Sequence, residues 1–334
     1  MLSLQLPLPL PPINNGFSHC NPKPALCLLQ DRSRSGSGSG SGSLSRTSPS
    51  STSLIKYLLR ASATPADVVF EGEEVKGRET GFGTPAEEAL LLPVGLRPEL
   101  MPNHVAVIMD GNVRWARQKN FPSSFGHEAG VRALRELIEL CCKWGISVLT
   151  VFAFSTENWI RPKVEVDFLL NLFERVIQED LNNFMRENIR ISVIGDSKKL
   201  PVSLQKLIAE AEQITRNNSQ LQLIIAVSYS GQYDIVQACR SIADKVNNGL
   251  IAPNDITEAV IEQELETNCS NFPNPDLLIR TSGEQRVSNF LLWQLAYTEL
   301  VFVQPLWPDF GKADFIDALC SFQQRRRRFA GRDS

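Results

Sequence analysis

The sequence predicts an α/β protein: a single domain with a six-stranded, largely parallel sheet flanked by helices. Six apolar runs of four to eight residues, rich in β-branched side chains, occur at 104–109, 148–154, 189–194, 221–228, 277–280 and 300–303. Runs of that length suit strands buried on both faces. Helix-length segments lie between them at 131–144, 165–188, 201–217, 234–247 and 256–268. This alternation implies right-handed crossovers and a mostly parallel sheet with helices on both sides.

The first 95 residues differ in composition from the rest. Up to residue 60 there is one acidic side chain, Asp31, against several basic ones, with abundant Ser, Pro and Leu. That imbalance is typical of an organelle transit peptide. The tract 35–43 alternates Ser and Gly and lacks apolar surface to bury. We therefore expect a disordered transit peptide and linker over 1–95 and a folded domain over 96–334, the alternative being a plain unstructured tail.

Composition excludes several classes of protein. With 43% hydrophobic residues in 334 the chain can bury a full core. Its net charge of −3 gives no overall basic field, so nucleic-acid binding is not expected. No segment reaches the roughly 18 uncharged residues that a membrane span needs. Seven cysteines without CxxC spacing and three histidines disfavour a zinc site and favour reduced thiols in a reducing compartment.

Polar side chains gather where the predicted strands end. They follow five of the six runs, at 110–112, 155–158, 195–196, 228–231 and 280–284. Open α/β sheets bind ligands at the carboxyl ends of their strands. The pattern therefore predicts one shared cleft at that edge of the sheet.

The residue types in this cleft indicate an anionic, phosphorylated ligand. Four arginines follow directly on the strand-end loops, at Arg114, Arg161, Arg280 and Arg286. Guanidinium groups pair with phosphate oxygens in two-point geometry. Arg135 and Arg216 lie instead on predicted helix faces, and we interpret them as surface ion pairs.

Two carboxylates accompany these arginines. Asp110 ends the first strand and Glu299 directly precedes the last one, so both are expected to face the cleft. Magnesium usually takes one or two carboxylates together with substrate phosphates and water. The chain has no GxxxxGK[ST] loop, no GxGxxG turn and no DDxxD pair. The absence of these motifs disfavours a P-loop nucleoside triphosphatase, a dinucleotide-binding protein and a helical trans-prenyltransferase. The residues therefore favour magnesium-assisted diphosphate chemistry on an α/β sheet.

The segment 165–188 carries a wide apolar face at helical spacing, made of Phe168, Leu169, Leu172, Phe173, Val176, Ile177 and Phe184. Such a face usually packs into the core. Beside a diphosphate site it would instead form a wall for an isoprenoid chain, with the rings of Phe168 or Phe173 limiting the length of the product. The sequence leaves both interpretations open.

Five blocks of the sequence resemble the cis-prenyltransferase family, which includes undecaprenyl and dehydrodolichyl diphosphate synthases. They are HVAVIMDGNVRWA at 104–116, GHEAG at 126–130, FAFSTENWIRPKVEV at 152–166, PDLLIRTSGEQRVSNFLLWQ at 275–294 and AYTEL at 296–300. The resemblance covers 101–332, and the sequences of several blocks are similar to those of plant plastid members.

The resemblance implies an enzyme that condenses isopentenyl diphosphate, or a second allylic unit, with an allylic diphosphate and releases diphosphate. It implies Mg²⁺ as the cofactor, a homodimer, a catalytic domain over 96–334 and, with the leader removed, the plastid stroma. Asp110 and Asn158 would be catalytic, Asn158 or a substrate phosphate taking the proton. Asp110 and Glu299 would hold the metal. The substrate-binding residues would be Gly111, Asn112, Val113, Arg114, Trp115, His127, Ser155, Thr156, Glu157, Trp159, Arg161, Arg280, Arg286 and Ser288.

Four positions depart from the family pattern: Val113, Ser123, Gln232 and Ala330. Members often carry arginine in place of Ser123 and Gln232, and glycine or arginine in place of Val113. Ala330 stands in the C-terminal RxG motif of the family. These departures leave open a short or branched product. A catalytically silent partner subunit is the rival hypothesis, which retention of Asp110, Asn158, Arg280, Arg286 and Glu299 argues against. A generic phospholigand-binding protein would not explain the apolar helix face.

Overall fold

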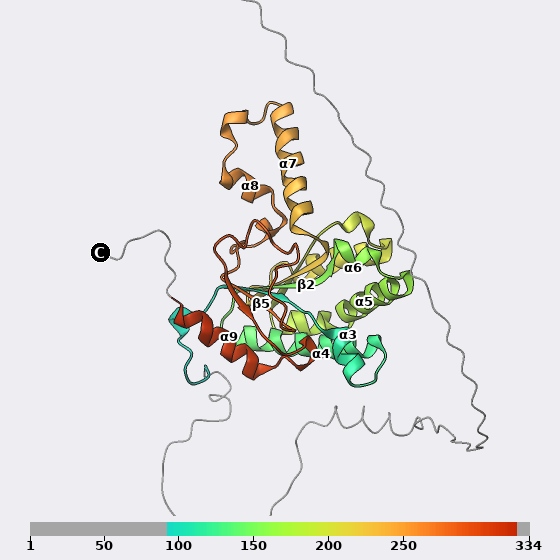
Figure 1. Ribbon diagram of the computed structural model, residues 1–334. Helices are drawn as coiled ribbons and strands as arrows, with labels where there is room; N and C mark the ends of the chain where they lie inside the picture. Colours follow the sequence, from blue (N-terminus) through green and yellow to red (C-terminus); the bar gives the residue numbers. More distant parts are fainter. Residues whose placement is uncertain (1–91, 326–334) are drawn as a thin grey trace, which may run out of the picture. The chain divides into compact units, whose positions relative to one another are not determined.

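The structure is a computed structural model that describes residues 92–325 (Figure 1). Its strands form one sheet in the order β3-β4-β2-β1-β5-β6, and every neighbouring pair is parallel. The predicted fold class is therefore confirmed. The strands are β1 His104–Ile108, β2 Val148–Ser155, β3 Ile189–Ile194, β4 Leu221–Tyr229, β5 Leu277–Arg280 and β6 Glu299–Phe302. The predicted transit peptide lies outside the described residues.

Seven α-helices connect or follow these strands: α3 Asn112–Gln118, α4 Ser123–Lys143, α5 Lys163–Arg186, α6 Val202–Thr215, α7 Gly231–Asn247, α8 Glu258–Glu264 and α9 Lys312–Gln324, counted over 92–325. The helix α4 begins at Ser123 rather than at 131. Its first two turns carry glycines and polar side chains instead of an apolar repeat, so the sequence pattern gave no signal there. The helix expected over 256–268 is shorter, because α8 ends at Glu264 and a 3₁₀ turn at Glu266–Cys269 follows.

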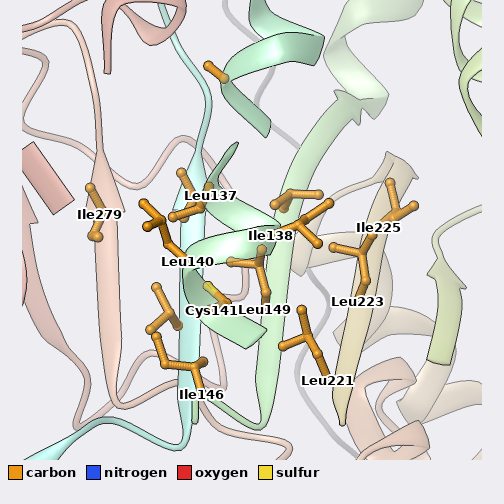
Figure 2. Packing of buried hydrophobic residues seen from close by; sticks show 14 of the residues in the cluster. Leu137, Ile138, Leu140, Cys141, Ile146, Leu149, Leu221, Leu223, Ile225 and Ile279 are labelled. Carbon is orange, nitrogen blue, oxygen red and sulfur yellow. The ribbon is translucent and has the colours of Figure 1, made fainter. Parts of the chain in front are cut away.

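One face of the sheet is covered by α4, α5 and α9, and α6 packs beside α5 and the edge strand β3. Figure 2 shows α4 lying over the strands, with Leu137 and Cys141 directed at them. They meet Leu149 on β2 and Leu223 on β4, and all four side chains are buried. Burying such side chains contributes on the order of 2 kcal/mol each, so this face anchors the helices that surround the site.

The second face is covered by the irregular segment after β5 rather than by a long helix. Phe290 and Leu291 from this segment are fully buried against the sheet. The ring of Phe290 stacks on Phe152 with centroids 4.4 Å apart. This packing fixes the loop that follows Arg280, and that loop carries the residues of the RTSGEQRVSN block.

Two further features of 92–325 bear on the expectations from sequence. No helix in this range is both long and apolar enough to cross a bilayer. The cysteines in this range, Cys141, Cys142, Cys239, Cys269 and Cys320, are all free, as expected. Cys239, however, is exposed rather than set in apolar surroundings.

Candidate active site

The carboxyl ends of β1 and β5 bring Asp110 and Arg280 together. The strands are neighbours, and Ile108 pairs with Arg280 in their register. Arg280 Nη2 donates to Asp110 Oδ2 at 3.0 Å. The backbone of Asp110 is fixed by Thr281, whose hydroxyl accepts from the Asp110 N–H at 2.9 Å and donates to the Asp110 carbonyl at 2.7 Å. The carboxylate is thus held at the sheet edge by the neighbouring strand.

The Asp110 carboxylate is kept ionised. Burial raises its pKa, but hydrogen bonds from Arg280 and Arg114 outweigh burial and bring the net pKa below the usual range. Arg114 Nη2 lies 3.1 Å from Asp110 Oδ1 and 2.6 Å from Ser282 Oγ. An ionised carboxylate has about four acceptor positions, so two remain for a cation or a water.

Arg280 is a buried guanidinium with a fixed orientation, since only 4% of the residue is exposed. Its Nη1 donates to Ser288 Oγ at 2.7 Å and to the Arg286 carbonyl. Its Nε is buried without a hydrogen-bond partner in the described chain. Arg286 itself is 61% exposed and pairs with Glu284 at 2.5 Å, and Glu284 also pairs with Arg114 at 3.3 Å. The two outer arginines are therefore more exposed than the central one.

Asp110 and Arg280 face one cavity of about 560 Å³. Nine of the predicted site residues line it: Asp110, Asn112, His127, Ser155, Glu157, Asn158, Arg161, Arg280 and Ser288. They come from the loop after β1, from α3, α4 and β2, from the 3₁₀ turn Thr156–Ile160 and the residue after it, and from β5 and the loop after it. The cleft predicted at the carboxyl edge of the sheet is present, and its lining carries both carboxylates and guanidinium groups.

The turn after β2 is held by its own side chains. Asn158 Oδ1 accepts from the Ser155 N–H at 3.0 Å, in a capping box. The amide oxygen is the proton-accepting atom of asparagine, and one of its two lone pairs is engaged by this hydrogen bond. Glu157 accepts from Asn289 Nδ2 at 2.9 Å; burial raises its pKa, and this hydrogen bond helps to bring the net pKa below the usual value. The turn is thereby tied to the loop after β5.

His127 lies on the opposite wall of the cavity as a neutral imidazole. Burial and the charge of Arg161 lower its pKa to about 4, although Glu165 acts in the other direction. Among residues 92–325 neither its buried Nε2 nor the buried Oδ1 of Asn112 has a hydrogen-bond partner. Two unpaired polar atoms lining one cavity mark positions where a ligand would supply the missing partner.

The glycines of the GHEAG block bring α4 against the start of α3. A Cβ at Gly130 would lie 2.4 Å from Asn112 Oδ1 and 2.9 Å from Trp307 Cδ1. A Cβ at Gly126 would lie 2.0 Å from the Asn112 carbonyl oxygen. Only glycine allows this approach, and it places His127 and Asn112 on the same cavity.

A second, apolar cavity of about 130 Å³ continues from the polar one. Both are lined by Met109, Asn112, His127, Ala153 and Leu169. The apolar cavity then passes between the sheet and the facing sides of α4 and α5, where Leu134, Phe173, Val176 and Ile177 line it. The helix α5 thus supplies both core packing and a cavity wall. Phe173 lines the cavity, whereas Phe168 lies outside its lining and packs near His127 with centroids 6.3 Å apart.

The remaining predicted site residues do not line the polar cavity. Arg114 and Arg286 flank it through their ion pairs. Gly111 packs against Leu306, and Trp115 donates to Asp309 at 2.7 Å. Trp159 donates to Ser228 at 2.9 Å. Val113 and Thr156 are likewise absent from its lining.

The placement of Glu299 beside Asp110 is wrong within this chain. Glu299 is the first residue of β6 and pairs in register with Leu277, the first residue of β5. Because all strands are parallel, it lies at the amino edge of the sheet, opposite to Asp110. Its carboxylate pairs with Arg325 Nη1 at 2.6 Å. A residue that precedes a strand faces the other edge from one that follows it, which the interpretation from sequence overlooked.

Some lining residues of the polar cavity were not predicted from the sequence. Five of them are apolar and were assigned to strands or to the helix face: Ile108, Met109, Phe152, Ala153 and Leu169. Asn289 is the one polar lining residue that was not predicted. It directly follows Ser288 in the RTSGEQRVSN block, and this position could have indicated it.

The fold and the site define an α/β protein with a cleft of arginine and carboxylate side chains at the carboxyl edge of a parallel sheet, next to an apolar cavity between the sheet and two helices. A family model, Prenyltransf, described as undecaprenyl diphosphate synthase, matches residues 108–330. The chain therefore belongs to the cis-prenyltransferase family, whose members condense allylic diphosphates with isopentenyl diphosphate.

Curated relatives and solved structures agree with this assignment. The chain is 63% identical over 251 residues to dehydrodolichyl diphosphate synthase 2 of Arabidopsis thaliana, covering 75% of this chain and 81% of the relative. It is 63% identical over 247 residues to the chloroplastic cis-prenyltransferase 4 of Solanum lycopersicum, covering 74% and 80%. Lavandulyl diphosphate synthase from Lavandula x intermedia, solved with dimethylallyl diphosphate, is 45% identical with a TM-score of 0.68, covering 70% of this chain and all of that one.

Proposed function

We propose that this chain elongates an allylic diphosphate with isopentenyl diphosphate in a magnesium-dependent reaction. One diphosphate would lie among Asp110, Asn112, Arg114 and His127, and that of isopentenyl diphosphate against Arg280, Arg286 and Ser288. The single observation that carries the proposal is that Asp110 and Arg280, in contact with each other, open onto one polar cavity that continues into an apolar one.

The residues around Asp110 fit a magnesium ion that is shared with substrate. Among residues 92–325 no group of three or more His, Cys, Asp or Glu side chains is arranged to hold a metal. Magnesium keeps several waters and commonly binds through one carboxylate plus phosphate oxygens. Asp110 is ionised, faces the cavity and retains free acceptor positions. When bound, the ion neutralises charge on a diphosphate leaving group.

The chain's own residues position the reactants. As the bond between the allylic carbon and its diphosphate oxygen breaks, Arg114 and the neutral His127 lie where they can donate to the leaving group. The double bond of isopentenyl diphosphate then forms the new carbon–carbon bond, and a proton leaves its C2. Because an amide is a weak base and the Asn158 oxygen already accepts from the Ser155 N–H, we assign Asn158 to positioning and the proton to a diphosphate oxygen.

Two further parts of the proposal concern assembly and location. We propose a homodimer formed across β6, one of the two strands that end the sheet, because three of its four residues are only partly buried within this chain. Tyr297, just before β6, is 81% exposed. We also propose the plastid stroma with removal of the leader. The scarcity of acidic residues over 1–60 and the chloroplastic names of relatives support this location.

The function is tested with the full chain and labelled isopentenyl diphosphate. Dimethylallyl, geranyl and farnesyl diphosphates are offered separately, with Mg²⁺ or with a chelator in excess. We expect one diphosphate released per condensation, a product with a new cis double bond, and no turnover under chelation. Binding of both substrates without diphosphate release would instead show a silent partner subunit.

A further inference from the structure

An ion pair lies at the far end of the apolar cavity. Arg135 on α4 donates from Nε to Asp180 Oδ2 on α5 at 2.8 Å, and from Nη2 to Glu179 Oε2 at 3.0 Å. Asp180 is 6% exposed, which is low for a carboxylate. Both Arg135 and Asp180 line the apolar cavity, among side chains that are otherwise mostly aliphatic or aromatic. The interpretation of Arg135 as a simple surface ion pair is therefore incomplete.

The pair lies at the end of the cavity opposite to the diphosphate site. His127 on α4 and Leu169 on α5 line both the polar and the apolar cavity. With a rise of about 1.5 Å per residue, Arg135 lies roughly 12 Å along α4 from His127, and Asp180 roughly 16 Å along α5 from Leu169. A chain that grows away from Asp110 would meet this pair after passing the apolar part.

Beyond the pair lies a separate, polar groove of about 350 Å³. Glu139, Lys143, Asn183 and Arg186 are among its lining residues. Arg135, Ile138, Asp180 and Phe184 line both this groove and the apolar cavity, and so form the partition between them. Arg135 and Asp180 are the charged part of that partition.

We propose that the Arg135–Asp180 ion pair closes the apolar cavity and sets the maximum length of the prenyl product. To pass the partition, an apolar tail has to separate the pair and leave the Asp180 carboxylate buried without its partner, which is strongly unfavourable. Burial lowers the pKa of Arg135, but its hydrogen bonds to Asp180 and Glu179 raise the net pKa above the ordinary value, so the guanidinium keeps its charge. The proposal rests on the apolar cavity being the site of the growing chain.

The test replaces the pair as a unit. The double variant Arg135→Met, Asp180→Leu removes both charges without leaving either one unpaired. We expect the product distribution, measured by chromatography and mass spectrometry, to shift upward by at least one isoprene unit. The KM for the allylic primer should stay within twofold, because the pair is remote from the diphosphate site. If the products keep the parent length, the proposal is overturned.

Arg175→Met is the matched control. Arg175 joins the same two helices by pairing with Glu128 at 3.0 Å, but it does not line the cavity. Its loss should leave the product length unchanged. A shift equal to that of the double variant would point to looser packing of α4 on α5 and would contradict the assignment.

A third variant separates the proposal from its premise. Val176→Phe fills the cavity before the pair and should shorten the product. If it does so while the double variant leaves the length unchanged, the cavity holds the chain and the ion pair is not its limit. If neither changes the length, the chain lies elsewhere and both statements fail. Should the double variant not fold, the pair Arg135→Gln, Asp180→Asn removes both charges while keeping polar side chains, and it must lengthen the product for the proposal to stand.

Discussion

Arg280 and Asp110 are 170 positions apart in the sequence, yet Nη2 of the arginine lies 3.0 Å from Oδ2 of the aspartate. The contact exists because β1 and β5 are adjacent and parallel, so their carboxyl ends lie together. In this contact each group neutralises the other. Under the proposed function, a diphosphate with its cation would offer each group a new partner of opposite charge.

Asp110→Asn should lower turnover by about 10²–10³-fold while the protein stays folded, because it removes the negative charge that would hold the magnesium ion against the reacting diphosphate. The measurement is kcat under saturating substrates, with thermal unfolding as the check on folding. Asp309→Asn is the control, since Asp309 accepts from Trp115 outside the cavity lining and should leave kcat nearly unchanged. A loss of only a fewfold for Asp110→Asn would argue against the assignment.

Arg280→Lys should raise the KM for isopentenyl diphosphate at least tenfold. A lysine keeps the charge but cannot reach Asp110, Ser288 and the Arg286 carbonyl together from one buried position. Initial rates over a range of isopentenyl diphosphate concentrations measure this. An unchanged KM with lower kcat would assign Arg280 to the leaving group instead.

Gly130→Ala should destabilise the protein by about 1–3 kcal/mol and reduce turnover, because the new methyl group overlaps Asn112 and Trp307. Gly311→Ala is a matched control: the nearest atom to its added Cβ lies at 3.9 Å and its φ of −130° suits any residue. Denaturant unfolding of both variants gives the comparison. Equal stability of the two would show that α4 does not need the close approach to Asn112.

Glu266→Gln should stabilise the protein above pH 7. Burial and the charge of Asp234 raise the pKa of Glu266 from 4.5 to about 7, although the Gly195 N–H opposes them. An acid whose pKa is higher in the folded state binds more protons there, so stability falls as pH rises from about 4.5 to 7. Removing this titration gains at most about 3 kcal/mol at pH 8. Unfolding free energies at pH 5 and pH 8 test it, and an equal change at both would contradict it.

The sheet and the meeting of Asp110 with Arg280 were predictable because each depends on a local signal. Short β-branched runs identify buried strands, and polar residues directly after parallel strands meet at one edge. Asn112, His127, Ser155 and Arg161 followed from the same logic or from the family resemblance, and all of them line the cavity.

What the sequence could not predict depends on pairing or packing between distant segments. The misplacement of Glu299 is different, because the order of residues in the sequence already indicated that a residue preceding a parallel strand lies at the amino edge. The first turns of α4 carry no apolar repeat, since they are shaped by contact with Asn112. The partition by Arg135 and Asp180 requires α4 and α5 to face each other, so a helix-face arginine looked like a surface residue.

The most direct test of the account is a crystal structure with a sulfur-bridged, unreactive analogue of farnesyl diphosphate and Mg²⁺. We expect the diphosphate against Asp110, Asn112 and His127, and the apolar tail between α4 and α5, ending before Arg135 and Asp180. Density for the diphosphate outside the cavity shared by Asp110 and Arg280, or for a tail lying on the outer surface of α5, would contradict it.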